Sequence, residues 1–322
     1  KNHLLKNYSS STFFLILYNW LMKINFQHEN YKEQVFNLPF FVFRKKNKIH
    51  KNKLGKLFFI ISAYLITLIF KLLNESIFCS FMNVIYKSDG KIKWDSENKV
   101  YYKLFNKSKI YYPNKYRISG SMVNHKHELN NLLDSYCLNN FEINKDDIVV
   151  DCGANIGAFY LALNQYIDSF LYFGYEPDPN AYNCLNLNLQ NYKNVKIFKK
   201  GLSYKVGKSN LYLESNYGDS SLEQFNSNEK IEIEISSLDN EEIENIRLLK
   251  IDAEGHELGV LEGAKKMLSR IDFICVDMGS EKGDLNENTT SEVVNFLLNN
   301  GFHLFRFNEN RTTGLFKNNL II

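Results

Sequence analysis

The residues with the clearest chemical meaning form a glycine loop, Asp151-Cys152-Gly153-Ala154-Asn155-Ile156-Gly157. The loop follows a short apolar run at 148–151 and precedes another at 158–166, so it joins a predicted strand to a predicted helix. Because glycine has no Cβ, the backbone of such a loop can approach a ligand closely. Glu176 ends the next predicted strand, where a carboxylate can bind both hydroxyls of a ribose. Together, the loop and the acid predict a site for a nucleoside-containing cofactor.

The order of residues in the loop indicates which cofactor fits. A dinucleotide-binding loop has the pattern Gly-x-Gly-x-x-Gly and places a pyrophosphate at the start of the next helix. This loop has the pattern Gly-x-Asn-x-Gly after Asp151, whose carboxylate would repel a pyrophosphate but can accept from an ammonium group. S-adenosylmethionine has an amino-acid end and a sulfonium, and no phosphate. The loop therefore favours S-adenosylmethionine over a nicotinamide dinucleotide.

Predicted strands and helices alternate from about Asn144 onward. The predicted strands are 148–151, 170–175, 195–198, 211–213, 231–235, 246–251, 273–277, 302–307 and 315–322, and the predicted helices are 158–166, 179–189, 258–268 and 291–300. Such alternation predicts an α/β fold, a doubly wound and mostly parallel sheet covered on both faces. Ligands of these sheets bind beyond the carboxyl ends of the strands. The glycine loop and Glu176 both follow strand ends, as this rule requires.

Three sequence blocks resemble the signature of the FkbM-type S-adenosylmethionine-dependent methyltransferases. They are the glycine loop, Tyr-Glu-Pro-Asp-Pro at 175–179 and Leu-Lys-Ile-Asp-Ala-Glu-Gly-His-Glu at 249–257, with a smaller match at Gly201-Leu202-Ser203. The resemblance covers about residues 100–322 and implies a class I methyltransferase (Rossmann-like) fold. It also implies methylation of a hydroxyl, often on a sugar or a natural product. The predicted cofactor-binding residues are Asp151, Gly153, Ala154, Asn155, Gly157, Glu176, Pro177, Leu202 and Asp252.

The third block supplies the candidate catalytic residues Asp252, Glu254 and His256. A hydroxyl is a poor nucleophile while protonated, so a base near the acceptor is useful. His256 is the first candidate, since the ordinary pKa of histidine is about 6.5, and a carboxylate is the alternative. In a purely structural interpretation Asp252 caps the following helix, Glu254 favours its positive end and His256 is a surface residue. A metal held by Asp252 and Glu254 is an open alternative, but two carboxylates do not define a site, so no metal ligands are predicted.

Two other segments have weaker signals. His125 and His127 form a His-x-His pair without further ligands nearby in the sequence, which favours a polar loop over a metal site. Residues 217–222, Tyr-Gly-Asp-Ser-Ser-Leu, form either an acceptor-side loop or an ordinary turn.

The N-terminal part of the chain differs in charge from the rest. Residues 1–56 carry a formal charge of +9 and the remainder −6, within a total of +3. The basic run Arg44–Lys56 leads into Leu57–Phe70, fourteen residues without charge. A span of the bilayer needs about 20 apolar residues, so a buried helix, an interfacial helix at an anionic membrane and a spanning segment all remain open. Without an accompanying fold signature, the basic run does not predict a nucleic-acid partner.

These patterns divide the chain into a basic and apolar helical region at 1–87, a β-rich hairpin region at 88–140 and a methyltransferase domain at 141–322. Five scattered cysteines without a Cys-x-x-Cys pattern favour the reducing cytoplasm. Residues 44–73, which contain the basic run and the uncharged segment, are the candidate region for peripheral membrane contact. The predicted activity is O-methylation of a carbohydrate or other small-molecule acceptor. The alternatives are an NAD-dependent oxidoreductase and a catalytically silent binding module. The sequence does not identify the acceptor or the oligomeric state.

Overall fold

The computed structural model describes Ile61, Leu65 and residues 68–85, 89–105, 108–121, 125–167, 169–213, 220–224, 229–283 and 287–320. The chain divides into two compact units, Lys1–Phe78 and Cys79–Ile322. The division into three regions predicted from the sequence stays a prediction. The basic run Arg44–Lys56 lies outside the described residues.

Only the end of the first unit is described. Ile61, Leu65 and Leu68 are exposed, Ile69 is half-buried and Phe70 is buried, so the described part of Leu57–Phe70 has one fully buried position. Phe70 and Phe78 meet edge to face, with ring centroids 5.3 Å apart. Among the described residues, no helix is long and apolar enough to cross a membrane. The role of this segment stays a prediction.

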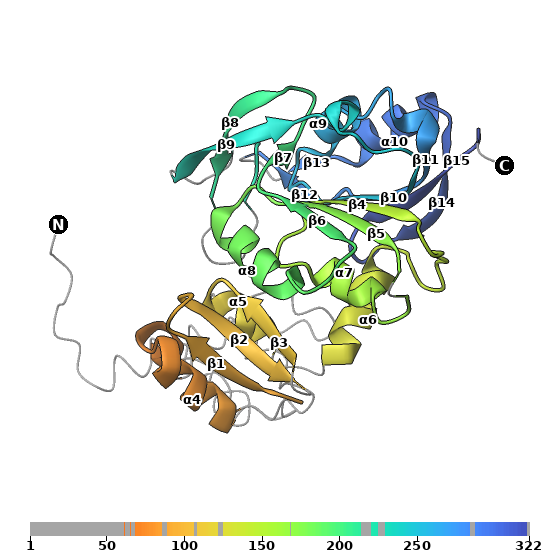
Figure 1. Cartoon of the computed structure of the whole chain (residues 1–322). Coiled ribbons are helices and arrows are strands. Elements are labelled where there is room, and N and C mark those ends of the chain that lie inside the picture. The colour runs from red at the N-terminus through yellow and green to blue at the C-terminus, as the bar shows by residue number, and fades with distance from the viewer. Residues whose placement is uncertain are drawn as a thin grey trace, which may run out of the picture. The chain divides into compact units, whose positions relative to one another are not determined.

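The second unit is built on a seven-stranded sheet (Figure 1). Its strands, in spatial order, are β14 (Phe302–Asn308), β15 (Thr313–Asn318), β11 (Ile271–Asp277), β10 (Ile246–Ile251), β4 (Ile148–Cys152), β5 (Leu171–Tyr175) and β6 (Val195–Phe198). All pairs from β11 to β6 are parallel, and β15 is antiparallel to both of its neighbours. The predicted mostly parallel, Rossmann-like sheet is confirmed.

Helices cover both faces of this sheet, as Figure 1 shows. Helices α9 (Glu257–Glu262) and α10 (Thr290–Asn299) lie on one side, and α6 (His125–Ser135), α7 (Ala158–Leu163) and α8 (Pro179–Leu189) on the other. Successive strand residues point to opposite faces. Val150 and Leu249 therefore enter the core under α9 and α10, while Val149 and Leu248 enter the core under α7 and α8.

Two sequence-based expectations about helices were wrong. The helix predicted at 258–268 ends at Glu262, and Gly263 after it packs so closely on Ser203 that a Cβ would lie 2.0 Å from the Ser203 carbonyl oxygen. The Asp239 carboxylate then accepts from the backbone N–H groups of Lys266 and Met267. The second error concerns His125 and His127, which begin helix α6 and do not lie in a polar loop.

Three small sheets complete the second unit. One lies in the segment predicted to be rich in β-strands and contains β1 (Lys91–Asp95), β2 (Val100–Phe105) and β3 (Ser108–Tyr112). The segments before and after this sheet form α4 (Glu75–Ile85) and α5 (Lys115–Gly120). The others contain β7 (Gly201–Leu202), β8 (Gly207–Tyr212) and β9 (Lys230–Ser236), and β12 (Ser280–Lys282) and β13 (Glu287–Asn288).

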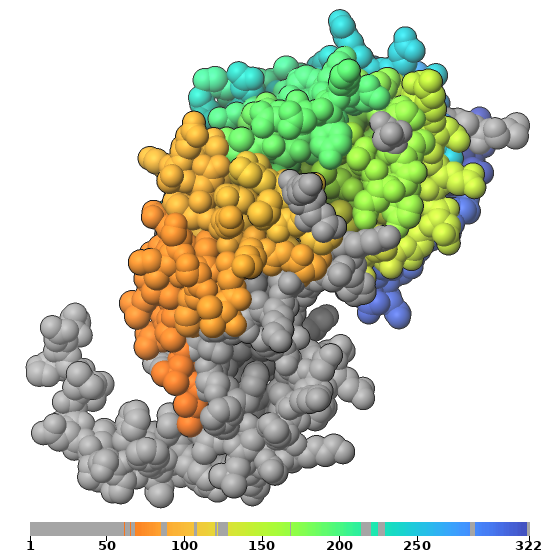
Figure 2. All heavy atoms as spheres, turned by 60° about the horizontal axis from the view of Figure 1, so that its bottom comes forward, coloured from red at the N-terminus to blue at the C-terminus, as the bar shows by residue number. Residues whose placement is uncertain are grey.

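Asn188 on α8 joins the first of these sheets to the glycine loop. Its side chain accepts from the N–H of Tyr111 on β3, at 2.8 Å, and donates to the carbonyl oxygens of Tyr111 and Ile156. Figure 2 shows the gold atoms of the small sheet next to the green atoms of the α8 region. One buried amide thus fixes the hairpin region to the loop that begins the predicted cofactor site.

We expect Asn188→Ala to lower the free energy of unfolding by about 1–3 kcal/mol, because it leaves buried backbone groups without partners. Asn186→Ala is the matched control, since Asn186 is an exposed asparagine on the same helix. Chemical denaturation measures both variants. Equal stabilities would contradict the anchoring role of Asn188.

Candidate cofactor site

The candidate site lies where the strand order of the main sheet reverses, between β4 and β10. From β4 the chain proceeds to β5 and β6 on one side, and later to β10 and β11 on the other, so the loops after β4 and β10 diverge and leave a crevice. A pocket lies there, with about 640 Å³ of space that is partly open to solvent. Its lining includes Gly153, Asn155, Glu176, Pro177, Asp178, Leu202, Ser220, Leu222, Asp252 and Glu254.

The glycine at position 153 is required by the meeting of two strand ends. Gly153 has φ +78°, and a Cβ there would lie 1.9 Å from the carbonyl oxygen of Asp252. Gly153 and Ala154 both donate their backbone N–H to the carbonyl oxygen of Tyr175. The first glycine thus allows a close approach of β4 to β10, and it also lines the pocket, where a close approach of backbone to ligand is predicted.

Glu176 presents its carboxylate to the pocket in a fixed orientation. Its Oε2 accepts from the N–H of Asn155 at 2.7 Å, and its Oε1 from the N–H of Asp178 at 2.8 Å. Each oxygen keeps a further lone pair for a ligand. Burial raises the pKa of Glu176 to about 7, although both backbone donors favour the charged form. Glu176 therefore changes its charge near neutral pH.

Asp151 lies behind the pocket and not at the predicted position on its wall. Its carboxylate is fully buried, lies 2.9 Å from the ammonium of Lys250 and accepts from the hydroxyl of Tyr172. It does not line the pocket. The expectation that Asp151 meets a ligand ammonium is thus corrected, because a lysine of this chain already occupies that position.

Lys250 is itself a central residue of the site. Its Nζ donates to the carbonyl oxygen of Gly153 at 2.8 Å and lies 3.6 Å from Oδ2 of Asp252. Burial alone would lower the pKa of Lys250, but the charges of Asp151 and Asp252 outweigh it and raise that pKa. The ammonium therefore stays charged and joins the glycine loop to the end of β10.

Asp252 lies on the pocket wall and does not cap α9. Its Oδ2 accepts from Nη2 of Arg311 at 3.0 Å and from the hydroxyl of Tyr136. Its Oδ1 is buried and has no hydrogen-bond partner among the described residues. Burial would raise the pKa of Asp252, but Lys250 and Arg311 outweigh it and hold that pKa below its usual range. Asp252 is thus an anion with one oxygen left for a ligand, and a weak base.

His256, the first candidate base, faces away from the pocket. Its Nδ1 lies 2.7 Å from Oε1 of Glu223, and its Nε2 lies 3.0 Å from Oγ of Ser203. A Cβ at Gly259 would lie 2.3 Å from Nε2, so the ring packs directly on the first turn of α9. The side chain is only 10% exposed. His256 is therefore neither a base at the pocket nor a surface residue.

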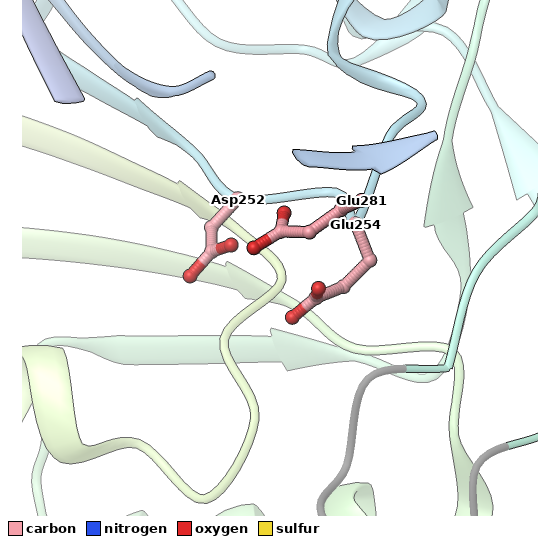
Figure 3. Close-up of side chains that lie close together, drawn as sticks. All are labelled: Asp252, Glu254 and Glu281. Carbon is pink, nitrogen blue, oxygen red and sulfur yellow. The ribbon is translucent and has the colours of Figure 1, made fainter. Parts of the chain in front are cut away.

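Three carboxylates lie close together at the end of β10 and the start of β12 (Figure 3). Each of Asp252, Glu254 and Glu281 has a carboxylate oxygen within 4.8 Å of the others. In Figure 3 the side chains of Asp252 and Glu281 point toward one another, with Glu254 beside them. Burial, and then the charges of nearby carboxylates, raise the pKa of Glu281 to about 8. Proximity of acids alone does not define a cation site.

The predicted site residues thus fall into two groups. Those that line the pocket are Gly153, Asn155, Glu176, Pro177, Leu202, Asp252 and Glu254. Those that lie behind it are Asp151, Ala154, Gly157 and His256: Ala154 is buried in the core, and a Cβ at Gly157 would crowd Leu185 and Leu189 of α8. Of the predicted acceptor-side loop, residues 217–219 lie outside the described residues, while Ser220 and Leu222 line the pocket.

Sequence reasoning missed four residues of the site: Tyr136, Lys250, Glu281 and Arg311. Lys250 had a readable signal, because a charge inside an apolar strand needs a buried partner. The other three come from distant segments, and no pattern in the sequence connects them to Asp252.

We expect Lys250→Met to lower the free energy of unfolding by about 3–5 kcal/mol, because it leaves the buried Asp151 charge without its partner. The double variant Asp151→Asn with Lys250→Met should recover part of this loss. Lys208→Met is the control, since Lys208 forms a 2.6 Å ion pair with Glu232 at the surface, where such pairs contribute little. Urea denaturation distinguishes the variants, and equal effects at 208 and 250 would contradict the buried pairing.

Comparisons with known proteins agree on a methyltransferase. Residues 151–304 match the family model described as "Methyltransferase FkbM domain". Methyltransferase sdnD of Sordaria araneosa is 27% identical over 170 residues, which covers 41% of this chain and 66% of that protein. Hexuronic acid methyltransferase AglP of Haloferax volcanii is 25% identical over 148 residues, which covers 42% of this chain and 58% of that protein.

The chain thus spans less than two thirds of the length of both relatives. A crystal structure of a methyltransferase FkbM from Methylobacillus flagellatus KT aligns with 17% identity and a TM-score of 0.38, over 56% of this chain and 46% of that one. The fold assignment rests on the sheet order and the crevice between β4 and β10. Residues 151–304 match the model of the FkbM methyltransferase domain, and the sheet order with its crevice is that of a Rossmann-like fold.

Proposed function

We propose that the protein is an S-adenosylmethionine-dependent O-methyltransferase that acts on a sugar hydroxyl. The observation that carries this proposal is the Glu176 carboxylate, fixed by two backbone N–H groups on the wall of the crevice between β4 and β10. A carboxylate at this place in a doubly wound sheet suits the two hydroxyls of a ribose.

The residues of the pocket fit such a cofactor at both of its polar ends. Glu176 would hold the ribose through the lone pairs that the backbone leaves free. Oδ1 of Asp252 is a buried acceptor without a partner among the described residues, which suits the ammonium of the amino-acid end. Leu202 and Leu222 give the pocket apolar surface for the base.

When bound, the cofactor supplies a methyl group on a positively charged sulfur. The chain must place the acceptor oxygen about 3 Å from that methyl group and remove the hydroxyl proton. Glu254 and Glu281 offer carboxylates beside Asp252, so either can accept this proton. The raised pKa of Glu281, about 8, makes it a stronger base than Asp252 once it has lost its own proton, whereas the lowered pKa of Asp252 makes that carboxylate a weak base.

The acceptor class follows from the same carboxylates. Carboxylates accept hydrogen bonds from the hydroxyls of a sugar and repel anionic groups. The similarity to a protein named a hexuronic acid methyltransferase supports a carbohydrate acceptor. We expect the hydroxyl that is methylated to belong to an uncharged part of that carbohydrate.

Isothermal titration with S-adenosylmethionine and S-adenosylhomocysteine tests the cofactor. The Glu176 carboxyl loses its proton above pH 7, so wild-type affinity should rise with pH and level off above about 8. Glu176→Gln should weaken both ligands by about 10–100-fold at pH 8, because a charge-assisted contact is lost, and should flatten the pH dependence. Glu244→Gln, at an exposed position, is the control. Absence of binding to wild type, or unchanged binding to Glu176→Gln, would defeat the proposal.

Mass spectrometry of glycans from the producing organism tests the acceptor. Deletion of the gene should remove one methyl group from one glycan class, and the wild-type gene should restore it. An Asp252→Asn gene should restore it poorly. An unchanged glycan profile after deletion would count against a sugar acceptor.

A further inference from the structure

We propose that Arg311 is a positioning residue for Asp252: it fixes the carboxylate so that Oδ1 faces the pocket and can bind the ammonium of the cofactor. The proposal rests on the proposed function. Arg311 lies between β14 and β15. Tyr136, which also donates a hydrogen bond to Oδ2 of Asp252, follows α6; Figure 1 labels these elements. Both residues lie outside the segment 151–304 that matches the family.

The guanidinium of Arg311 is held on three sides. Its Nε donates to Oδ2 of Asp277 at 2.5 Å, and its Nη2 donates to the hydroxyl of Tyr136 at 2.9 Å. The group also lies over the Tyr136 ring, 4.4 Å from the centroid. Because the Asp277 side chain is only 2% exposed, this anchor is itself fixed. Arg311 therefore presents Nη2 to Asp252 with little freedom to move.

These contacts determine how the Asp252 carboxylate is turned. Oδ2 receives hydrogen bonds from Arg311 and from the Tyr136 hydroxyl. Two donors on one oxygen oppose rotation of the carboxylate about its terminal torsion, which is otherwise broad. Asp252 lines the pocket, and its Oδ1 is a buried acceptor without a hydrogen-bond partner among the described residues. An acceptor that is fixed before binding needs no reorganisation when a ligand arrives.

The charges around Asp252 explain why Lys250 alone does not keep the Asp252 carboxylate charged and oriented. Carboxyl groups face it from several elements, namely Asp151 on β4, Glu254 after β10, Glu257 on α9, Asp277 on β11 and Glu281 on β12. The positive groups are Lys250 on β10 and Arg311, and the Tyr136 hydroxyl is the neutral donor. Lys250 is already paired with Asp151 at 2.9 Å and lies farther from Asp252. Loss of Arg311 would therefore raise the pKa of Asp252 and leave its orientation free.

The pair of strands β14 and β15 offers a matched control. Arg306 on β14 also connects this pair to the segment after α6, because its Nη1 donates to the carbonyl oxygens of Cys137 and Asn139. No contact joins it to Asp252 among the described residues. Arg306→Gln therefore removes an equivalent structural tie and leaves the carboxylate contacts in place.

Titration calorimetry with S-adenosylmethionine at pH 8 and pH 6 tests the proposal on the full chain. Arg311→Gln should bind about tenfold more weakly than wild type at pH 8, and the ratio to wild type should grow at pH 6 as Asp252 gains a proton. Arg311→Lys should recover part of both effects. Arg306→Gln should match wild type at both pH values. Equal affinities of Arg311→Gln and Arg306→Gln, with the same pH dependence, would overturn the proposal.

A second measurement does not depend on the cofactor. Carbon-13 NMR of labelled aspartate, assigned with Asp252→Asn, follows the protonation of Asp252 directly. Tyr136→Phe removes one donor and should raise the apparent pKa in the direction of Arg311→Gln, so it replaces that variant if the arginine change prevents folding. An Asp252 titration that neither variant alters would overturn the proposal. Failure of wild type to bind the cofactor, with these shifts present, would instead defeat the proposed function.

Discussion

The buried ammonium of Lys250 is the interaction on which the rest of the site depends. Strands β4 and β10 can meet at the crevice only because Gly153 has no side chain, and Lys250 then holds the carbonyl oxygen of Gly153 at 2.8 Å. The same ammonium compensates Asp151, which would otherwise be an unpaired charge inside the core. Lys250 thus both holds the glycine loop in place and balances the charge of Asp151.

From Lys250 the charges alternate in sign across the carboxyl ends of the strands. Asp151 pairs with Lys250, Lys250 lies near Asp252, Asp252 pairs with Arg311, and Arg311 pairs with Asp277. Alternation lets several acids be buried close together, because each has a positive neighbour. Three acceptors are left over: Glu176 on the pocket wall, Glu281 beside Asp252, and Oδ1 of Asp252, which has no hydrogen-bond partner among the described residues. Because no positive group in the described part of the protein is bound to these acceptors, the pocket suits a ligand with a positive charge and several hydroxyls.

Much of the fold could be predicted because it depends on local patterns. The strands at 195–198 and 246–251 and the helix at 179–189 have the predicted bounds. The helix predicted at 258–268 was too long, because after Glu262 the backbone N–H groups of Lys266 and Met267 bind the distant Asp239 carboxylate, which the local sequence does not show. The pocket residues within the three sequence blocks were found for a similar reason, since strand ends position them. Arg311 and Tyr136 were missed because only the tertiary fold brings them to Asp252, and Asp151 was misplaced because the sequence does not show that Lys250 reaches it.

A crystal structure with S-adenosylhomocysteine bound tests the account most directly. The account predicts the ribose hydroxyls on the Glu176 carboxylate and the amino group on Oδ1 of Asp252, with Arg311 and Tyr136 still on Oδ2. An amino group bound to Asp151, with Lys250 displaced, or a ligand outside the crevice between β4 and β10, would contradict it.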